Sequence, residues 1–187
     1  MKDRMTAESI RLFEKNGFSQ TSIQDIVNAL RVTKGTFYYY FSSKEQLLME
    51  IHLEYISNLL GRQQKIMDNT GLSQKEKLWE IIKLLIKDIT DKGPSARVFF
   101  REIRHLTDDN IANIKQKRDQ FRLNIEKIIH EGIEEREFRQ NLRTDMITFG
   151  ILGITNYSYQ WYKPDGEVTP EELVDIYVDL VLKGIEE

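Results

Sequence analysis

The feature that most constrains this chain is the scarcity of helix breakers in its long charged and aliphatic stretches. Only 3 of its 187 residues are proline and 10 are glycine, too few for the many tight turns of a β-sandwich or barrel. Leu, Ile, Glu, Lys and Arg, most of them strong helix formers, fill the stretches between these breakers. We therefore predict an all-α protein.

Three short helices are predicted near the N-terminus. The first, over 5–15, ends at Asn16 and Gly17. The second covers 23–30, where apolar residues recur at i, i+3, i+4 and i+7. Thr33 is the N-cap expected for the third helix. Because so few residues separate the second and third helices, they must cross sharply, as in a helix-turn-helix.

Longer amphipathic helices are predicted over the rest of the chain. One starts after Ser42 and Ser43 and runs into the mid-60s, and the last begins at Pro170. The others cover 75–90, 94–106, 107–136 and 144–162. The pattern predicts about nine helices in all.

Several classes of site are disfavoured by the residues present. The chain has no cysteine, which excludes disulfides, thiol nucleophiles and cysteine-ligated zinc. Its three histidines are scattered without metal-ligand spacing, and no nucleophile, base and oxyanion set emerges. We therefore expect no catalytic residues, no metal, no cofactor and no enzymatic activity.

No apolar run approaches the roughly 18 residues that span a membrane, and the N-terminus lacks the apolar core of a signal peptide. We expect a cytoplasmic protein with no membrane partner. The net charge of −3 is unevenly distributed. Residues 1–50 hold seven basic and six acidic residues, or +1, and the remainder holds 20 and 24, or −4. A local basic face on the N-terminal part is therefore compatible with nucleic-acid binding.

One extended motif carries the functional signal. The stretch KGTFYYYFSSKEQLL at 34–48 follows Leu12-Phe13, Gly17-Phe18, Thr21-Ser22 and the 23–30 helix in a fixed spacing. This pattern resembles the DNA-binding domain of the TetR family of bacterial transcription regulators. The resemblance implies a three-helix helix-turn-helix domain over 1–48 and a helical effector-binding and dimerisation domain over 49–187. It also implies a bacterial protein associated with the nucleoid when it is bound to DNA.

The chemistry of the third helix suits DNA. Its N-terminal end must approach phosphates and base edges, so Gly35 permits close approach and Lys34 supplies a cation. Successive helical residues are about 100° apart, so three adjacent tyrosines cannot all face one core. We expect Phe37 and Phe41 to turn inward. The DNA-binding residues predicted from this chemistry and from the resemblance are Thr21, Ser22, Thr33, Lys34, Gly35, Thr36, Tyr38, Tyr39, Tyr40 and Lys44.

The turn before the third helix departs from the family pattern. Arg31 occupies a turn in which the family more often has glycine or another small residue. This departure adds a cation able to reach a phosphate.

In the C-terminal part, the segments FFREIR at 99–104, RDQF at 118–121, IIHEGI at 128–133 and LGITNYSYQWY at 152–162 carry a further resemblance. They resemble the acyl-CoA-responsive subgroup of the family, which includes FadR-type and KstR-type repressors of fatty-acid and sterol degradation. Such an effector needs an apolar tunnel for its chain and cations for its phosphates. The predicted effector-binding residues are Phe99, Arg101, Arg104, Phe121, Phe149, Tyr157 and Trp161. The resemblance also implies a homodimer, formed through the last two helices, that reads a double-stranded palindromic operator and is released from it by a fatty acyl-CoA.

Two other functions fit the same residues. Tyr157, Trp161 and nearby acids are able to form a cation–π pocket, which favours a TetR-type regulator of a multidrug efflux gene that responds to aromatic or cationic compounds. The arginines also lie among acidic residues, as in ordinary surface ion pairs. A helical interaction protein without DNA affinity is the remaining alternative.

Overall fold

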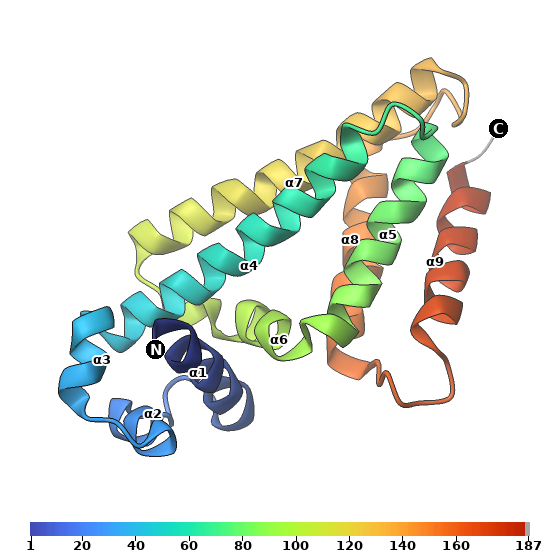
Figure 1. Cartoon of the computed structure of the whole chain (residues 1–187). Helices are drawn as coiled ribbons and strands as arrows, with labels where there is room; N and C mark the ends of the chain where they lie inside the picture. The colour runs from blue at the N-terminus through green and yellow to red at the C-terminus, as the bar shows by residue number, and fades with distance from the viewer. Residues whose placement is uncertain (186–187) are drawn as a thin grey trace. The chain divides into compact units, whose positions relative to one another are not determined.

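The computed structural model describes residues 1–185, and this range contains nine α-helices and one short 3-10 helix (Figure 1). The all-α prediction is confirmed. The chain divides into two compact units. Unit 1 consists of residues 1–57 and 94–116, and unit 2 of residues 58–93 and the chain from 117 onward. Each unit is described by itself, and three helices contribute residues to both, one of them only its first residue, Gly93. Within residues 1–185, no helix is long and apolar enough to cross a membrane.

Unit 1 is built around a small aromatic and aliphatic core. Its first elements are α1 (Lys2–Asn16), α2 (Ile23–Leu30), α3 (Lys34–Tyr40) and the beginning of α4 (Lys44–Met67). It also holds nearly all of α6 (Gly93–Glu102), the 3-10 helix η1 (Ile103–His105) and the start of α7 (Asp108–Glu134). Fully buried side chains from all six α-helices form the core, among them Met5, Phe13, Ile26, Phe37, Leu47, Val98 and Ile114.

Local side-chain bonds fix where the short helices begin and end. After α1, Gly17 has a φ of +84°, a left-handed value that favours glycine. At the start of α2, the Ser22 amide donates to Asp25 Oδ2 at 2.8 Å while the Asp25 amide donates to Ser22 Oγ at 3.1 Å. At the start of α3, Thr33 Oγ1 accepts a hydrogen bond from the Thr36 amide at 3.2 Å. The predicted cap at Thr33 is confirmed, and Ser22 is the N-cap of α2.

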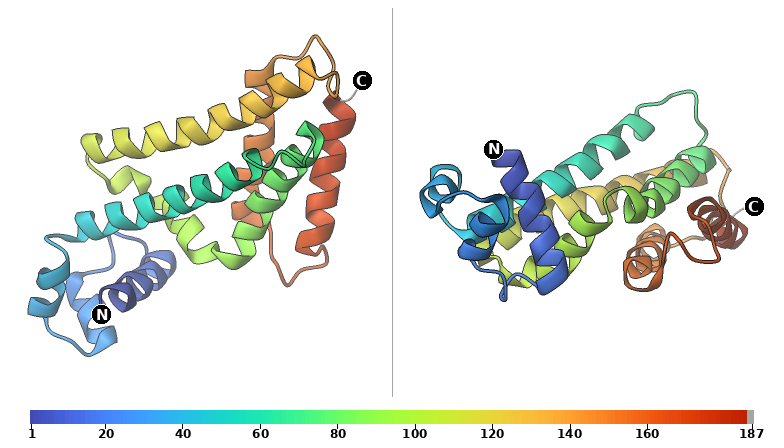
Figure 2. Two further views of the ribbon diagram at one scale, coloured as in Figure 1. Left: turned by 45° about the horizontal axis from the view of Figure 1, so that its top comes forward. Right: turned by 60° about the horizontal axis from the view of Figure 1, so that its bottom comes forward.

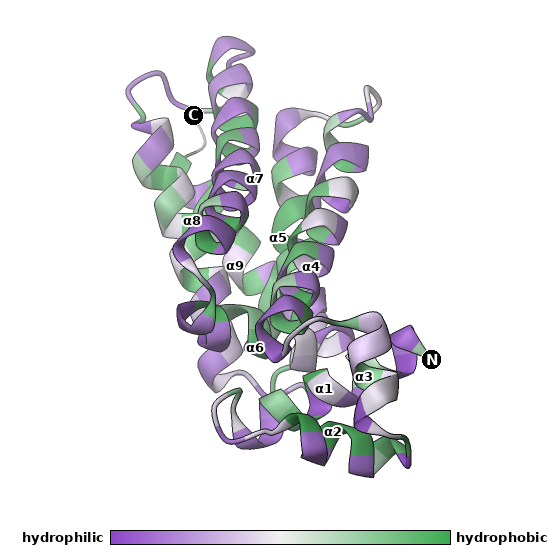
Figure 3. Ribbon diagram, turned by 90° about the vertical axis from the view of Figure 1, so that its left-hand side faces the viewer, coloured by the Kyte–Doolittle hydropathy of each residue, from purple (hydrophilic) through white to green (hydrophobic). Residues whose placement is uncertain are grey.

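Unit 2 is a bundle of longer helices. It contains α5 (Gln74–Asp91), α8 (Thr144–Trp161), α9 (Pro170–Ile185) and the remaining parts of α4 and α7. Helix α5 lies alongside α8 and α9 (Figure 1). Helices α8 and α9 are neighbours in both views of Figure 2, and Ser158 Oγ lies 2.8 Å from Tyr177 Oη. Green and purple segments alternate along α4, α5 and α7 in Figure 3, as expected for amphipathic helices.

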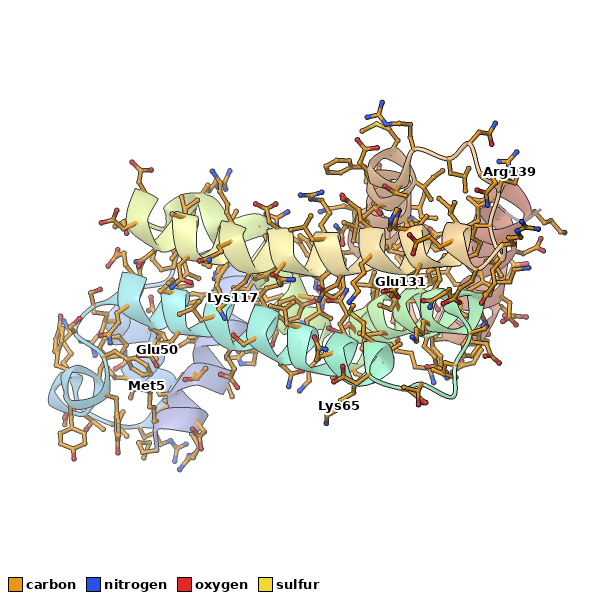
Figure 4. All side chains as sticks on the ribbon, turned by 90° about the horizontal axis from the view of Figure 1, so that it is seen from above. Met5, Glu50, Lys65, Lys117, Glu131 and Arg139 are labelled. Carbon is orange, nitrogen blue, oxygen red and sulfur yellow. The ribbon has the colours of Figure 1, made fainter. Side chains whose placement is uncertain are left out.

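The connection after α7 fastens two other helices of unit 2. The Glu137 carboxylate accepts hydrogen bonds from the amides of Gln74 and Lys75, at 3.2 and 2.8 Å, and so caps the start of α5. The Arg139 amide donates to the Ile185 carbonyl at 2.9 Å, at the end of α9 (Figure 4). Gly132 makes this arrangement possible, because a Cβ there would lie 2.3 Å from the ring of the buried Phe138.

The structure corrects one predicted helix. We expect a continuous helix over 94–106, but α6 ends at Glu102 and is followed by the 3-10 turn of η1. Glu102, with φ −100° and ψ 0°, leaves the α-helical region at this point. Its buried carboxylate lies 3.3 Å from His105 Nε2, and this pair spans the tighter turn.

Candidate nucleic-acid interface and effector residues

The helix-turn-helix is formed by α2 and α3, and its turn is held in an unusual backbone conformation. Arg31 has a φ of 56° and a ψ of 44°, which is left-handed. Its amide donates to the Asn28 carbonyl at 3.1 Å, and the Val32 amide donates to the Val27 carbonyl at 2.9 Å. The turn that the family builds with a small residue or glycine is therefore formed here by an arginine, which carries a steric cost.

The side chains of α3 divide into an inner and an outer set. Phe37 and Phe41 are fully buried, with ring centroids 5.6 Å apart. Tyr38 is 55% exposed and Tyr39 is 80% exposed. Tyr40 is half-buried, and its ring lies edge-on to that of Tyr39. The predicted division between buried phenylalanines and outward tyrosines is confirmed.

The N-terminal end of α3 is open to a ligand. Thr33, Lys34 and Gly35 are exposed and Thr36 is half-buried. A Cβ at position 35 would meet its nearest neighbour, Thr33 Oγ1, at 3.5 Å, an ordinary contact distance. The packing of unit 1 therefore leaves room for a side chain at position 35, and the absence of one leaves the backbone accessible.

An open groove of about 400 Å³ lies beside this end of α3. It is lined by Ser22, Ile23, Gln24, Lys34, Tyr38, Ser42, Ser43, Lys44 and Glu45. These residues include the first turns of α2 and α4, whose backbone N–H groups favour anions. Five lining residues are outside the predicted set, namely Ser42, Ser43 and Glu45 before and in the first turn of α4, and Ile23 and Gln24 in the first turn of α2. For Ile23 and Gln24, the position directly after the N-cap Ser22 is the signal that would have found them.

Thr21 and Lys44 differ from the sequence interpretation, because both side chains turn into unit 1. The Thr21 hydroxyl donates to the carbonyls of Gly17 and Leu12, at 2.9 and 3.3 Å, and the residue is buried. Lys44 Nζ donates to the carbonyls of Phe18 and Thr21, both at 2.8 Å. Partial burial lowers the pKa of Lys44. Both side chains thus bond to backbone carbonyls of unit 1, and Lys44 also lines the groove beside α3.

The predicted effector residues of unit 1 separate into a core residue and two surface cations. Phe99 is buried, and its ring lies 5.2 Å from that of His52 and 4.8 Å from that of Tyr55. Arg101 and Arg104 are exposed, and an Arg101 guanidinium nitrogen donates to the Glu14 carbonyl at 2.7 Å. The two arginines line an open groove of about 500 Å³ together with Glu14, Lys15, Asn16, Gly17 and Glu102.

The predicted effector residues of unit 2 lie in two environments. Phe121 is buried, whereas Phe149, Tyr157 and Trp161 are 53%, 67% and 49% exposed on α8. Each of these three turns much of its surface outward, and their assignment to effector binding stays a prediction. Further exposed apolar side chains are Met146 on α8 and Ile176 and Leu180 on α9.

Buried polar side chains in unit 2 were not anticipated from the sequence. Asp88 is fully buried, and its Oδ1 lies 2.6 Å from an Arg62 guanidinium nitrogen. The Gln63 amide donates to the Phe121 carbonyl at 2.9 Å and accepts from Asn124 at 2.8 Å. The signal for Asp88 is its spacing, because it follows Ile81 and Leu85 on the apolar stripe of α5.

Comparisons with known proteins agree with this architecture. Residues 6–51 match the family described as bacterial regulatory proteins, tetR family, and residues 71–185 match the tetracyclin repressor-like, C-terminal domain. The transcriptional repressor KstR2 of Mycolicibacterium smegmatis is 28% identical over 185 residues, which cover 98% of this chain and 90% of that protein.

Two solved structures show the same fold. The TetR-family regulator PfmR from Thermus thermophilus superposes with a TM-score of 0.90 at 28% identity, covering 98% of this chain and all of the other. The regulator AibR, solved in complex with isovaleryl coenzyme A and operator DNA, superposes with a TM-score of 0.85 at 25% identity, covering 96% of each chain.

The two family matches account for both ends of the protein, and the C-terminal match alone spans more than half of the chain. They confirm the prediction of a DNA-binding regulator and of a protein that is not an enzyme. The same family matches exclude the alternative of a helical interaction protein without DNA affinity. The chain is a member of the TetR family of bacterial transcriptional regulators.

Proposed function

We propose that this protein is a homodimeric repressor that binds a palindromic operator through α3 and is released by a CoA thioester, with fatty acyl-CoA as the effector class. The observation that carries the DNA part is the division of α3: Phe37 and Phe41 anchor it from within, while Tyr38 and Tyr39 are turned outward beside an accessible Gly35. A helix presented in this way is suited to entering a major groove.

The proposed DNA contacts follow from chemistry and exposure. Lys34 supplies a cation to the phosphate backbone, and the tyrosine hydroxyls reach phosphates or base edges. Gly35 lets the sugar-phosphate backbone come close to the helix. The full proposed set is Ser22, Thr33, Lys34, Gly35, Thr36, Tyr38, Tyr39 and Tyr40, all of them at least partly exposed.

The proposed dimer forms through α8 and α9. Exposed apolar side chains on α8 recur at Met146, Phe149, Tyr157 and Trp161, and Ile176 and Leu180 are exposed on α9. Apolar side chains gathered in this way are typical of a surface that a partner covers. A twofold pair of α3 helices then reads two half-sites of a palindrome, about one helical turn of DNA apart.

The proposed effector is supported by resemblance and by charge. AibR, which is similar over 96% of both chains, was solved with isovaleryl coenzyme A. In this protein, Arg101, Arg104 and Lys15 line one open groove and offer cations to the phosphates of a CoA head group. Phe99, buried in the same unit, supplies part of an apolar environment for an acyl chain.

Release from DNA is a matter of differential affinity. An effector shifts the protein between DNA-binding and non-binding forms only by as much as it prefers one of them. A shift from 1:99 to 99:1 requires a preference of about 10⁴-fold. Acyl-CoA concentration should therefore move the apparent operator affinity in a saturable way.

The DNA part is tested by selecting genomic fragments on the purified protein and measuring affinity for the recovered duplex by fluorescence anisotropy. Gly35→Ala should fold at least as well as wild type, because position 35 has room for a Cβ, yet bind the duplex about tenfold or more weakly. Gly61→Ala, at an open position in α4, is the matched control and should bind normally. Normal binding by Gly35→Ala would refute the proposed docking of α3.

The effector part is tested by native mass spectrometry of the protein as purified, followed by titration of the DNA complex. Palmitoyl-CoA and isovaleryl-CoA are the test ligands, free CoA and palmitate are the controls, and tetraphenylphosphonium represents the cationic drugs of the efflux alternative. Release by a thioester but not by its separate halves supports the proposal. Release by tetraphenylphosphonium alone would replace it with the efflux function.

A further inference from the structure

Two buried amide side chains join α4 to α7 inside unit 2, where the two helices lie side by side (Figure 4). Gln63 Nε2 donates to the Phe121 carbonyl at 2.9 Å, and Gln63 Oε1 accepts from Asn124 Nδ2 at 2.8 Å. Asn124 Oδ1 accepts in turn from Gln120 Nε2 at 2.8 Å. Gln63 is fully buried and Asn124 is 8% exposed. We call the side chains of Gln63 and Asn124 the amide clasp.

The neighbours of Gln63 on α4 make different contacts. On one side, an Arg62 guanidinium nitrogen lies 2.6 Å from Oδ1 of the buried Asp88, which belongs to α5. On the other side, Gln64 is exposed, and its Nε2 donates to Asp68 Oδ1 at 2.7 Å within α4 itself. Of these two successive glutamines, only Gln63 connects α4 to another helix.

The turn of α7 at the clasp also carries a residue predicted to bind the effector. This residue is Phe121, whose side chain is buried and whose carbonyl accepts from Gln63. The guanidinium carbon of the next residue, Arg122, lies 5.4 Å from the centroid of the Phe149 ring on α8, a second predicted effector residue. A ligand that displaces this turn of α7 therefore acts directly on the bond to Gln63.

A buried amide pair restricts how two helices move past each other, because its hydrogen bonds are directional. An amide that loses its partner in the interior has no water to replace it, whereas apolar side chains of similar size tolerate small shifts. In coiled coils, one buried amide is enough to fix the register of paired helices. The clasp thus favours registers of α4 and α7 in which both amides are paired, and disfavours all positions between them.

We propose that the amide clasp couples the effector to the operator, because it keeps the effector-bound register of α4 and α7 from relaxing back to the operator-binding one. Gln63 and Asn124 are then positioning residues, and α4 begins only three residues after the end of α3. This inference rests on the proposed release of the operator by a CoA thioester.

The test replaces the clasp with apolar side chains of similar size, Gln63→Leu combined with Asn124→Leu. No backbone group is left unpaired, because the Phe121 carbonyl keeps its helical partner four residues on. Without effector, the double variant should bind the recovered duplex as wild type does, and it should bind palmitoyl-CoA equally well. The loss of operator affinity at saturating palmitoyl-CoA should be about tenfold smaller than in wild type. Gln64→Leu is the matched control and should respond normally.

Two results would overturn the proposal. The first is a wild-type response in the double variant. The second is weakened binding of palmitoyl-CoA, which would make the clasp part of the effector site itself. Failure of every acyl-CoA to release the wild-type protein from its duplex would instead refute the proposed effector.

The single changes separate coupling from a general loss of stability. Asn124→Leu alone leaves the buried Gln63 oxygen without its donor, and Gln63→Leu alone leaves Asn124 without its acceptor. Each should lower the midpoint of urea unfolding, and the double variant should recover most of the loss. Losses that simply add would show that the two amides act independently, which would contradict the clasp.

A measurement on the wild-type protein covers the case in which the double variant fails to fold. Side-chain amides are labelled with ¹⁵N, and their exchange with D₂O is followed by NMR with and without palmitoyl-CoA. The Gln63 amide should exchange slowly, and its resonance should shift when palmitoyl-CoA binds. The exposed Gln64 amide should exchange fast and keep its resonance. A Gln63 resonance that is unchanged at saturation would overturn the proposal.

Discussion

Replacing Gly132 with alanine should destabilise unit 2, although the same change elsewhere in a helix is favourable. Gly132 lies near the end of α7, directly against Phe138 in the connection that fastens α5 and α9. The new Cβ would lie 2.3 Å from two carbons of the Phe138 ring and 3.2 Å from Gln74 Cβ. Since the best separation between carbon atoms is about 3.5–4.0 Å, the ring must move by about 1 Å or more.

The expected change in the free energy of unfolding follows from two opposing effects. Alanine improves helix propensity over glycine by about 1 kcal/mol. Overpacking in a tight core costs about 1–3 kcal/mol and occasionally more. The buried Phe138 has little room to yield, so we take the upper part of this range, about 2–3 kcal/mol. We expect a net loss of about 1–2 kcal/mol in the free energy of unfolding, or about 2–8 °C in Tm for a chain of this size.

The assay is urea unfolding at a fixed protein concentration, because association of the chains would make stability depend on concentration. Gly61→Ala is the control, since a Cβ at that helical position meets no neighbour, and it should gain about 0.5–1 kcal/mol. Combining Gly132→Ala with Phe138→Leu should cost less than the sum of the two single changes. Equal stability of Gly132→Ala and wild type would refute the steric reasoning.

Three further predictions address the DNA-binding unit and the proposed dimer. Arg31→Gly should relieve the left-handed strain of the turn and raise the free energy of unfolding, measured by urea titration, by up to about 1 kcal/mol. The same change should weaken DNA binding, because it removes a cation. Reduced stability would contradict this account of the turn. The hydrogen bonds from Ser22 lower the pKa of the Asp25 carboxyl in the folded protein. The stability that they confer is therefore complete above the ordinary pKa of this carboxyl, and it is lost as the pH falls through the lower pKa of the folded protein. Asp25→Asn should therefore make the stability, measured by circular dichroism, less sensitive to pH below about 4. An acid transition unchanged by this substitution would contradict the stabilising role of the Asp25 carboxylate. Leu180→Asp places a charge on the exposed apolar face of α9 and should yield monomers in sedimentation experiments with helix content retained, whereas persistent dimers would place the interface elsewhere.

The helix pattern was predictable because its signals are local. Asn16-Gly17, Ser22 and Thr33 each end or begin a helix through bonds to residues within four positions. The outward position of at least one of the three tyrosines likewise follows from helical geometry alone. The end of α6 was missed because the turn at Glu102 involves a buried carboxylate whose burial the sequence does not reveal.

The orientation of individual site residues was harder to predict, since it depends on contacts between distant segments. Lys44 bonds to carbonyls 26 and 23 residues away, and a lysine at the start of a helix gives no sign of such partners. On α8, apolar residues occur on more than one face, so the pattern does not tell which face packs against α5 and which stays exposed. The sequence therefore does not indicate that Phe149, Tyr157 and Trp161 are exposed.

The discontinuous make-up of unit 1 limits how the protein can be re-engineered. Segment 94–116 belongs to the same compact unit as the helix-turn-helix, with Arg97 Nε 2.9 Å from Glu14 Oε1 on α1 and Phe99 packed beside Tyr55 on α4. A chimeric regulator made by joining residues 1–57 to a foreign sensor would leave these partners behind. A working graft needs matching residues at Arg97 and Phe99 in the recipient, or it must transfer both segments of unit 1, which requires three junctions, after 57, before 94 and after 116, rather than one.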